Sequence, residues 1–486
     1  MIGAIIFSIV KPIWALYFIL IFDVYWLFRV VYFVFYLMIS WRRLKVDSRV
    51  DWLDKLKREK PDWTRIWHLI FLPTSKEDIE ILRATLASLS KSRYEAKRFI
   101  IVLSGEERGG GERFLRDAEI LQTEFQNSFG HFLTILHPEN LPDEIPGKGS
   151  NLNFAGHRVR EFIDGLKIPY PDIIVSAFDI DTITHPQYFA YLSYKYLTVP
   201  DPLHSSYQPI ALYNNNIWEA PALIQIASLG TTFWLMTELP RPERLFTFSS
   251  HSMPWTALTE VGFWQKDIVT EDSRIFLQCF LHYNGDYRVT PLYLPVSMDT
   301  VTGANYLQSL VALYKQQRRW AWGIEHFPYM VWHFFQRRAI PLRKKIKFIW
   351  NLGEGMYSWA TAPILIFILG RLPFIAGDSF LGVSVFFQLT PLMLQWLMRA
   401  AMVGILVSAI LTSKLLPPLP STTSSYRRLL VILQWLLLPL TLIIFGSIPA
   451  FDAQTRLMLG KYLGFNVTEK YRQKLSSRTL DVVAKI

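Results

Sequence analysis

Long apolar runs occupy the two ends of this 486-residue chain, whereas in the middle short apolar runs alternate with polar stretches. The first long run, within residues 1–41, is interrupted by Lys11-Pro12, Asp23 and Arg29. At roughly 20 residues for each membrane crossing, it predicts either two short helices that turn near Asp23 or one long tilted helix with a short stub. We favour the hairpin. Because the run lacks a basic start and a small-residue cleavage site, we expect an anchor and not a removable signal peptide.

The middle of the chain, residues 64–302, has the pattern of an α/β domain. Four short apolar runs predict strands, and the stretch Glu77–Leu89 between them predicts a helix. The predicted strands are Trp67–Leu72, Phe99–Leu103, Phe132–Leu136 and Ile173–Phe178. Such alternation is typical of a largely parallel sheet. Since ligands bind these sheets at the carboxyl ends of the strands, we expect a binding site there.

The C-terminal part returns to membrane-type patterns. Residues 303–345 are aromatic and basic together, which predicts amphipathic helices that lie at a membrane interface. Within residues 346–449 three apolar segments are each long enough to cross a bilayer. They cover Phe348–Leu372, Pro391–Leu411 and Leu429–Phe445. Residues 450–486 predict an amphipathic helix, over about Phe451–Leu463, followed by a polar tail.

Composition and charge agree with a membrane protein. Hydrophobic residues make up 51% of the chain, and the formal net charge is +11. The basic residues gather beside the apolar blocks, in the linker 42–63 and around residues 337–347, which favours positive-inside anchoring and contact with membrane lipids over nucleic-acid binding. The single cysteine, Cys279, excludes an internal disulfide and a cysteine metal cluster. We therefore expect a multi-pass protein of the cytoplasmic membrane with a cytosolic domain.

Three short polar strings lie between the hydrophobic blocks. They are Asp179-Ile180-Asp181, Thr270-Glu271-Asp272 and Gln316-Gln317-Arg318-Arg319-Trp320. A D-x-D pair at a strand end can hold a hard divalent ion, and that ion can neutralise a nucleotide diphosphate leaving group. Each string also has a structural explanation, because aspartates are common in turns and Thr270 with two acids suits the start of a helix.

In this order the strings D-x-D, T-E-D and Q-x-x-R-W resemble those of membrane-integrated family 2 glycosyltransferases of the cellulose synthase and hyaluronan synthase type. The resemblance covers residues 68–320 well and the membrane segments only in layout. It implies a Rossmann-like GT-A domain over residues 64–302, flanked by transmembrane helices. It also implies an inverting transferase that uses a UDP-sugar donor and Mg²⁺ or Mn²⁺.

The resemblance assigns a donor side to the site. The implied donor-binding residues are Pro73, Thr74, Glu77, Glu106, Lys148, Asp179 and Arg319. Pro73 to Glu77 are similar to the family's P-x-x-N-E nucleotide loop, with Lys76 where asparagine is usual. Lys148 and Arg319 are expected to balance the diphosphate charge, Asp179 to contact the uridine or ribose, and Asp181 to hold the metal ion. Glu106 and Lys148 have a simpler alternative explanation as surface loop residues.

The acceptor side is implied by the other two strings. Within Thr270, Glu271 and Asp272, the last is the expected general base, which takes the proton from the acceptor hydroxyl as that oxygen attacks the anomeric carbon. Trp320 is expected to stack under the acceptor sugar, beside Gln316. One base suffices for a single inverting displacement.

A fourth string, Phe465-Asn466-Val467-Thr468-Glu469-Lys470, resembles the F-x-V-T-x-K gating loop of cellulose synthase in Phe465, Val467, Thr468 and Lys470. It also contains a formal glycosylation sequon, which would require the opposite side of the membrane. Three simple crossings after residue 343 would leave the string outside, whereas a gating loop must cover a cytosolic active site. One C-terminal segment must therefore be interfacial, or a further crossing is hidden in residues 380–411, or the match is coincidental.

Three functions stay open on the sequence alone. The favoured function is transfer of sugars to a growing β-linked polysaccharide. An extended version of this hypothesis adds passage of the product through the membrane helices. The second is addition of one sugar to a lipid acceptor, ceramide-like or polyprenyl-linked, because ceramide glucosyltransferase also carries D-x-D and Q-x-x-R-W. The third is a membrane assembly component with a degenerate transferase domain, although no catalytic string is lost here. The sequence predicts neither the donor sugar, the linkage nor the oligomeric state.

Overall fold

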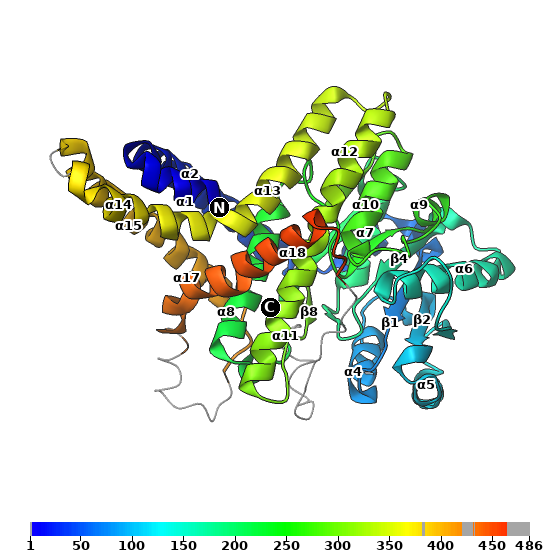
Figure 1. The fold of residues 1–486 in the computed structure, drawn as a ribbon. Coiled ribbons are helices and arrows are strands. Elements are labelled where there is room, and N and C mark those ends of the chain that lie inside the picture. Colours follow the sequence, from blue (N-terminus) through cyan, green and yellow to red (C-terminus); the bar gives the residue numbers. More distant parts are fainter. Residues whose placement is uncertain (1, 382–383, 420–430, 432, 464–486) are drawn as a thin grey trace.

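The computed structural model describes residues 2–381, 384–419, 431 and 433–463, and the structural statements below concern these residues. Figure 1 shows an α/β domain at one side and a group of long helices that extends away from it at the other. The two parts correspond to the polar middle and the apolar ends of the sequence.

The α/β domain is built on one eight-stranded mixed sheet in the order β3-β2-β1-β4-β7-β6-β8-β5. The four predicted strands are present, and each is parallel to its neighbours within this set. They are β1 (Trp67–Pro73), β2 (Phe99–Glu106), β3 (His131–His137) and β4 (Ile173–Ala177). The other strands are β5 (Ile183–Thr184), β6 (Ser205–Tyr213), β7 (His251–Pro254) and β8 (Arg288–Met298). Because only β5 and β7 run antiparallel to their neighbours, the predicted largely parallel sheet is confirmed.

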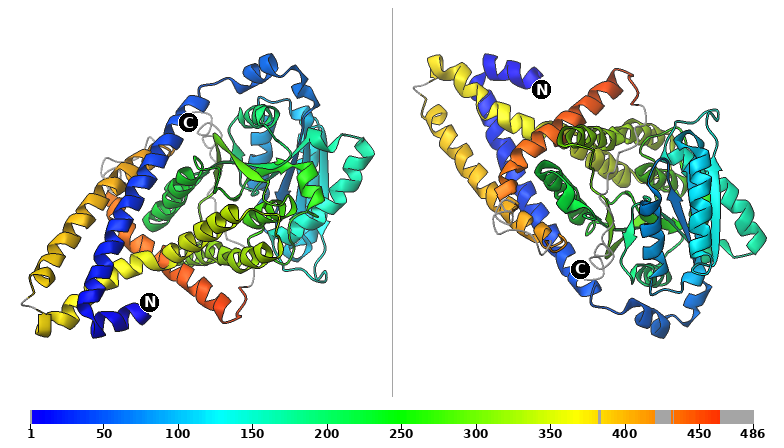
Figure 2. Two further views of the ribbon diagram at one scale, coloured as in Figure 1. Left: turned by 90° about the horizontal axis from the view of Figure 1, so that it is seen from above. Right: turned by 90° about the horizontal axis from the view of Figure 1, so that it is seen from below.

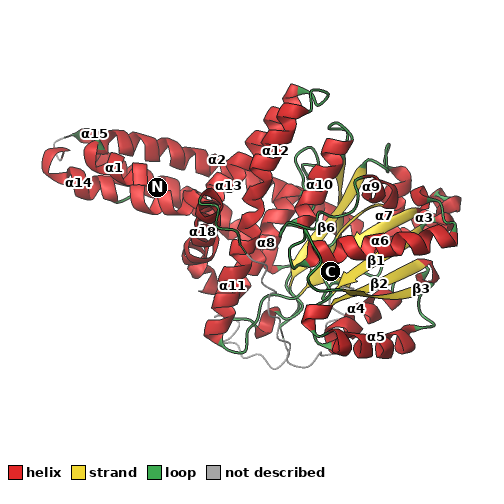
Figure 3. Cartoon of the chain, turned by 45° about the vertical axis from the view of Figure 1, so that its right-hand side comes forward, coloured by secondary structure: helices red, strands yellow, loops and turns green. Residues whose placement is uncertain are grey.

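Helices cover both faces of the sheet (Figure 3) because side chains alternate between the faces along each strand. On β1, Leu69 and Phe71 enter one core, whereas Ile70 and Leu72 enter the other. The first core takes in α6 (Lys148–Leu166), α9 (Trp255–Glu260) and α10 (Glu271–His282). The second takes in α3 (Trp52–Glu59), α4 (Ile79–Ser90), α5 (Gly111–Phe125) and α7 (Tyr188–Thr198). Helix α4 begins two residues later than predicted, since Asp78 accepts a hydrogen bond from Glu80 N and caps it.

The N-terminal run does not turn near Asp23, so that prediction is wrong. Helix α1 (Ile2–Val10) ends at Lys11, and α2 (Pro12–Asp47) then continues for 36 residues through Asp23. The break falls at Pro12 because proline suits the first turn of a helix but not its interior. The end of α2 reaches the α/β domain, where Leu37 and Leu44 are buried in the first core. Helical turns of α2 and α3 therefore occupy much of the predicted linker 42–63.

Four helices in the described part of the chain are long and apolar enough to cross a membrane. They are Pro12–Asp47, Leu342–Ala376, Val385–Ser413 and Gln434–Met458. The second and third contain α13 (Leu342–Leu369), the start of α14 (Leu372–Leu381) and all of α15 (Val385–Ser413), and α15 passes through Pro391 without a break. Both views of Figure 2 show α15 beside α2. Between the domain and α13, helices α11 (Tyr306–Ala321) and α12 (His326–Gln336) occupy the predicted amphipathic stretch.

The helical stretch Gln434–Met458, which ends in α18 (Ile448–Met458), contacts the α/β domain region at both of its ends. Near its start Gln434 Nε2 donates to Gln225 Oε1 of α8 (Ala222–Glu238) at 3.1 Å. Near its end Asp452 Oδ2 accepts from Arg318 Nη1 of α11 at 2.9 Å. Figure 1 shows the stretch, orange to red, running past α8 and α11. This helical stretch is therefore held against α8 and α11 at its two ends.

Candidate functional site

The first two polar strings meet at the carboxyl ends of the central strands. Asp179 and Asp181 follow β4, whereas Glu271 begins α10. Lys148, the first residue of α6, lies between them: its Nζ donates to Asp179 Oδ1 at 2.6 Å and is 3.9 Å from Glu271 Oε1. One half-buried lysine therefore connects the D-x-D string to the T-E-D string.

The charges of this cluster act on one another strongly. Burial alone would lower the pKa of Lys148, but the carboxylates of Asp179, Glu271 and Asp272 outweigh it and raise that pKa. Burial raises the pKa of Glu271 to about 8, and it also raises the pKa of Asp272, which Lys148 opposes. A carboxylate accepts a proton only when ionised. As the pH falls, Asp272 should therefore take up its proton at a higher pH than an exposed aspartate does.

Asp181 follows β4 and carries a carboxylate, the type of ligand that suits a hard cation. Its side chain is fully buried, and Asp299 N, just after β8, donates to its Oδ2 at 2.8 Å. Asp179 Oδ2 accepts a hydrogen bond from Ser249 Oγ. Carboxylate oxygens without sulfur ligands are the donor set preferred by Mg²⁺ and Mn²⁺. The carboxylates of Asp179 and Asp181 therefore fit the predicted ion by type, and the role of Asp181 as its ligand stays a prediction.

Thr270 stands at the N-cap position of α10, but its side chain makes no capping hydrogen bond. Instead Thr270 Oγ1 donates to Glu325 Oε1 at 2.9 Å and lies 3.2 Å from His326 Nε2. The capping role is therefore wrong, because the half-buried carboxylate of Glu325 competes for the hydroxyl proton as a stronger acceptor. The bond ties the start of α10 to the residue just before α12. Asp272 is held separately, with its Oδ1 accepting from Ser273 N at 2.8 Å.

The predicted nucleotide loop at the end of β1 is held in place by hydrogen bonds to Glu77, a residue of the loop itself. Glu77 Oε2 accepts from Thr74 Oγ1 at 2.9 Å, from Ser75 N at 2.7 Å and from Lys76 N at 3.0 Å. These bonds fix the backbone that follows Pro73. Glu77 is thus engaged within the loop, and its contact with a base or ribose stays a prediction.

Glu106, at the end of the neighbouring strand β2, is buried and not a solvated loop residue. Its Oε2 accepts from Arg108 Nε at 2.9 Å, and its Oε1 is 3.1 Å from His137 Nδ1. His137 is also 3.2 Å from Glu144 Oε1. Burial opposes protonation of His137, but both glutamates raise its pKa. No sequence pattern points to His137 or Glu144.

The third string lies on α11, where its residues face two directions. The Trp320 ring is 5.7 Å from the ring of Tyr213, the last residue of β6. Burial and the charges of Asp179 and Asp272 raise the pKa of Tyr213, whereas Arg319 lowers it, so these groups share one environment. Gln316 is buried, and Arg318 pairs with Asp452. The string therefore connects the carboxyl ends of the central strands to α18.

Several residues of this edge belong to strands that the sequence does not predict. Tyr213 ends β6, and Ser249 lies two residues before β7. His251 of β7 is buried beside Lys148 and Asp179, with its Nδ1 2.9 Å from Phe248 O. Burial lowers the pKa of His251 to about 4, so its ring is neutral near pH 7. The predicted gating residues Phe465, Val467, Thr468 and Lys470 lie outside the described residues.

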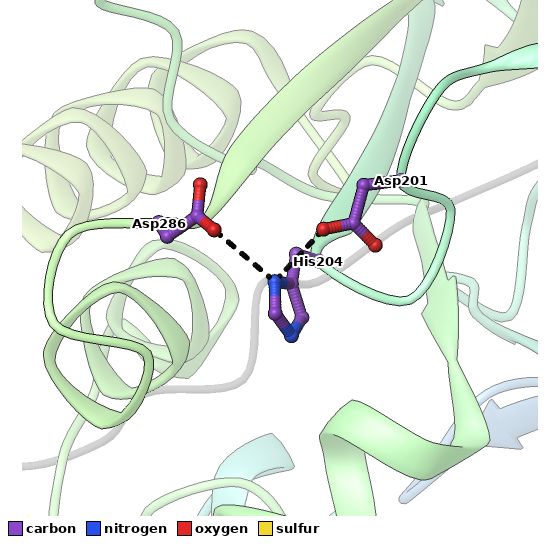
Figure 4. Close-up of side chains that lie close together, drawn as sticks. All are labelled: Asp201, His204 and Asp286. Carbon is purple, nitrogen blue, oxygen red and sulfur yellow. Dashed lines mark ion pairs between the residues drawn. The ribbon is translucent and has the colours of Figure 1, made fainter.

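A second cluster of metal-ligand types lies at the opposite edge of the sheet. His204 Nδ1 is 3.0 Å from Asp201 Oδ2 and 3.6 Å from Asp286 Oδ2, as Figure 4 shows. His204 precedes β6, whose carboxyl end carries Tyr213. Since β6 has nine residues and a strand rises ~3.3 Å for each, the cluster is well separated from Asp181. A metal ion held there could not contact a diphosphate at the D-x-D string.

Replacing Gly149 by alanine is expected to destabilise the site. An added Cβ would lie 2.8 Å from Gln265 O and 3.1 Å from Glu271 Cβ, so α6 and α10 must separate. We expect the free energy of unfolding to fall by about 1–3 kcal/mol, measured by thermal unfolding. The matched control is Gly165→Ala in the same helix, where a Cβ meets nothing within 4 Å. Equal destabilisation of both variants would contradict this explanation.

Comparisons with known proteins were made for the sequence and for the fold. A family model described as "Glycosyl transferase family group 2" matches residues 174–448, more than half of the chain. No curated protein matches the sequence. One similar solved structure is a mannosyltransferase of Pyrobaculum calidifontis in complex with GDP-Man and Mn²⁺. It has 14% sequence identity and a TM-score of 0.43, and the match covers 76% of this chain and 99% of the mannosyltransferase chain. Another is S. aureus TarS 1–349 in complex with UDP-GlcNAc, with 11% identity, a TM-score of 0.36, and coverage of 82% and 94%.

Proposed function

Because the chain belongs to the glycosyl transferase family group 2, we propose that it is an inverting, metal-dependent transferase that moves sugars from a UDP-sugar to a growing β-linked polysaccharide at the membrane. Its GT-A domain and its glycosyltransferase class follow from the family. The proposed mechanism rests on the position of Lys148. Its Nζ donates to Asp179 and lies near Glu271, the neighbour of Asp272. Groups suited to a diphosphate and a group suited to proton removal thereby share one edge of the sheet.

In the proposed reaction Asp272 removes the proton from the acceptor hydroxyl, whose oxygen attacks the anomeric carbon of the donor sugar. The bond from that carbon to the diphosphate breaks, and UDP leaves with the electron pair. Lys148 and Arg319 balance the charge of the diphosphate. Asp181 would hold Mg²⁺ or Mn²⁺, which when bound neutralises the leaving group. Trp320 and Gln316 position the acceptor sugar.

The polymer proposal is supported by the path of the chain before the fourth string. Leu463 is buried in a cluster with Trp322 and Val269, and Val269 directly precedes the T-E-D string. The described chain therefore ends, at Leu463, beside the T-E-D string, and this supports the proposal that the following residues Phe465, Val467, Thr468 and Lys470 act as a gating loop on the cytosolic side. Glycosylation of Asn466 would need the opposite side. A topology reporter fused after Lys470 that reports an extracytoplasmic position would overturn this assignment.

A donor screen with product sizing tests the function. The purified protein, in lipid and with Mn²⁺, is incubated with a panel of radiolabelled nucleotide sugars, and both nucleotide release and product length are measured. We expect UDP release with one donor and a long, water-soluble product. One added sugar confined to the lipid phase would favour single transfer to a lipid acceptor. Absence of release with every donor would favour the non-enzymatic assembly component.

A further inference from the structure

A cavity of about 500 Å³ lies between α2, α13 and residues 239–250, the segment that joins α8 to β7. Its walls include Phe28 and Arg29 of α2, Arg244 of the segment, and Lys347 and Trp350 of α13. Figure 2 shows α13 crossing α2 at this end of the molecule. Ligand sites in proteins commonly have volumes of roughly 300–1,000 Å³, so the cavity is large enough for a headgroup.

Positive groups around the cavity outnumber the carboxylates that could neutralise them. Arg29 Nη2 is 3.2 Å from Glu354 Oε2, and Tyr25 donates to the other oxygen of that carboxylate at 2.7 Å. One further carboxylate, Glu238, serves two arginines, Arg241 and Arg244.

Two more charged side chains of the lining, Lys347 and Glu243, are exposed to solvent. Neither of these two side chains forms an ion pair among the described residues. The lining carries three cations, Arg29, Arg244 and Lys347, against two carboxylates, Glu243 and Glu354, so its net charge is positive and it can accept an anion.

The position of the cavity and its apolar lining indicate the source of that anion. Lys347 is the last of four basic residues at the start of α13, directly before the apolar part of this candidate membrane span. Phe28 and Trp350 are 70% and 72% exposed on the same cavity. Basic pockets between membrane helices at their cytosolic ends are suited to anionic lipid headgroups. A free phosphate would leave both aromatic side chains uncovered.

We propose that this cavity binds the phosphate headgroup of an anionic membrane phospholipid, with Arg29, Arg244 and Lys347 around the phosphate and the acyl chains against Phe28 and Trp350. The site is distinct from the proposed donor site, but residues 239–250 reach both. Ser249, at the far end of this segment, donates to Asp179. An occupied headgroup site would therefore hold the segment that also orders the D-x-D string.

Native mass spectrometry of the full, delipidated chain tests the proposal, with dioleoyl phosphatidylglycerol, dioleoyl phosphatidylcholine and inorganic phosphate as probes. We expect the wild type to retain phosphatidylglycerol and the double variant Arg244→Gln/Lys347→Gln to bind it at least about tenfold more weakly. The matched control, Lys344→Gln/Lys345→Gln, removes two charges from the start of the same helix. These lysines donate to Gly285 O and Phe334 O, away from the cavity, so we expect near-normal binding.

Three results would overturn the proposal: equal binding of both lipids, an equal loss in the control variant, or competition by inorganic phosphate at the concentration of the lipid. If Arg244→Gln prevents folding, Lys347→Gln alone still tests the site, because Lys347 is exposed and its replacement leaves no buried charge unpaired. For this single variant we expect about threefold weaker binding, and unchanged binding would contradict the proposed site.

Discussion

Replacing Asp272 by asparagine is expected to lower sugar transfer by about 10²- to 10⁴-fold. Asparagine has nearly the same shape but cannot take the proton from the acceptor hydroxyl. Lys148 keeps its bond to Asp179, so donor binding should change little. The turnover number is measured by UDP release, and the dissociation constant of UDP by calorimetry. A large loss of turnover with nearly unchanged UDP affinity is the expected pattern.

The matched control is Asp267→Asn, because Asp267 is exposed and lies five residues earlier, in the loop before α10. It should retain wild-type turnover. If Asp272→Asn retains turnover as well, the base lies elsewhere, and the buried Glu271 becomes the next carboxylate to test. If Asp272→Asn loses UDP affinity to the same extent as turnover, the residue supports the donor site and not proton removal.

Replacing Asp181 by asparagine is expected to lower metal-dependent turnover by about 10³-fold, since a bound ion supplies several kcal/mol of charge stabilisation. Asparagine retains an oxygen for the hydrogen bond from Asp299 N, so the fold at the end of β8 should persist. Binding of Mn²⁺, followed by electron paramagnetic resonance with UDP present, provides a readout that does not depend on turnover. We expect the bound-ion signal to disappear in the variant.

The control for this experiment is Asp201→Asn, which removes one carboxylate of the Asp201, His204 and Asp286 cluster at the other edge of the sheet. Metal-dependent turnover and Mn²⁺ binding in the presence of UDP should be unchanged in this variant. Loss of both properties in Asp201→Asn, with both retained in Asp181→Asn, would assign the functional ion to the distant cluster and reject the role of the D-x-D string.

The sequence predicts β1 to β4 because each is a mostly apolar run. Strands β1, β2 and β4 are buried along almost all of their length, whereas β3, at the edge of the sheet, is mostly half-buried. The rest of the sheet has no such local pattern. Strand β6 carries Gln208 and Pro209 in its middle, and Gln208 is accommodated by distant partners: its Oε1 accepts from Phe248 N at 2.7 Å. Strand β7 has only four residues. Both depend on tertiary contacts, and so does the place of Tyr213 in the site.

The motifs predict which side chains meet at the catalytic edge, but not how they are connected. Asp179, Lys148 and Glu271 come together as the resemblance implies. The hydrogen bond from the Thr270 hydroxyl to Glu325, however, depends on a segment 55 residues farther along the chain. The turn expected at Asp23 failed for a related reason, because one aspartate does not end a helix that α15 packs against. Local patterns indicate residue types, whereas distant partners decide their roles.

The entry of α2 into the α/β domain has a consequence for folding cooperativity. Leu37 and Leu44 belong to the same buried core as the strands that carry the D-x-D string, and Arg43 Nη1 donates to Tyr293 OH of β8 at 2.9 Å. A fragment without residues 1–41 would lose Leu37 and expose part of that core to water. The catalytic domain and its first membrane helix should therefore unfold in one transition, and lipid insertion and catalytic geometry share a single folding free energy.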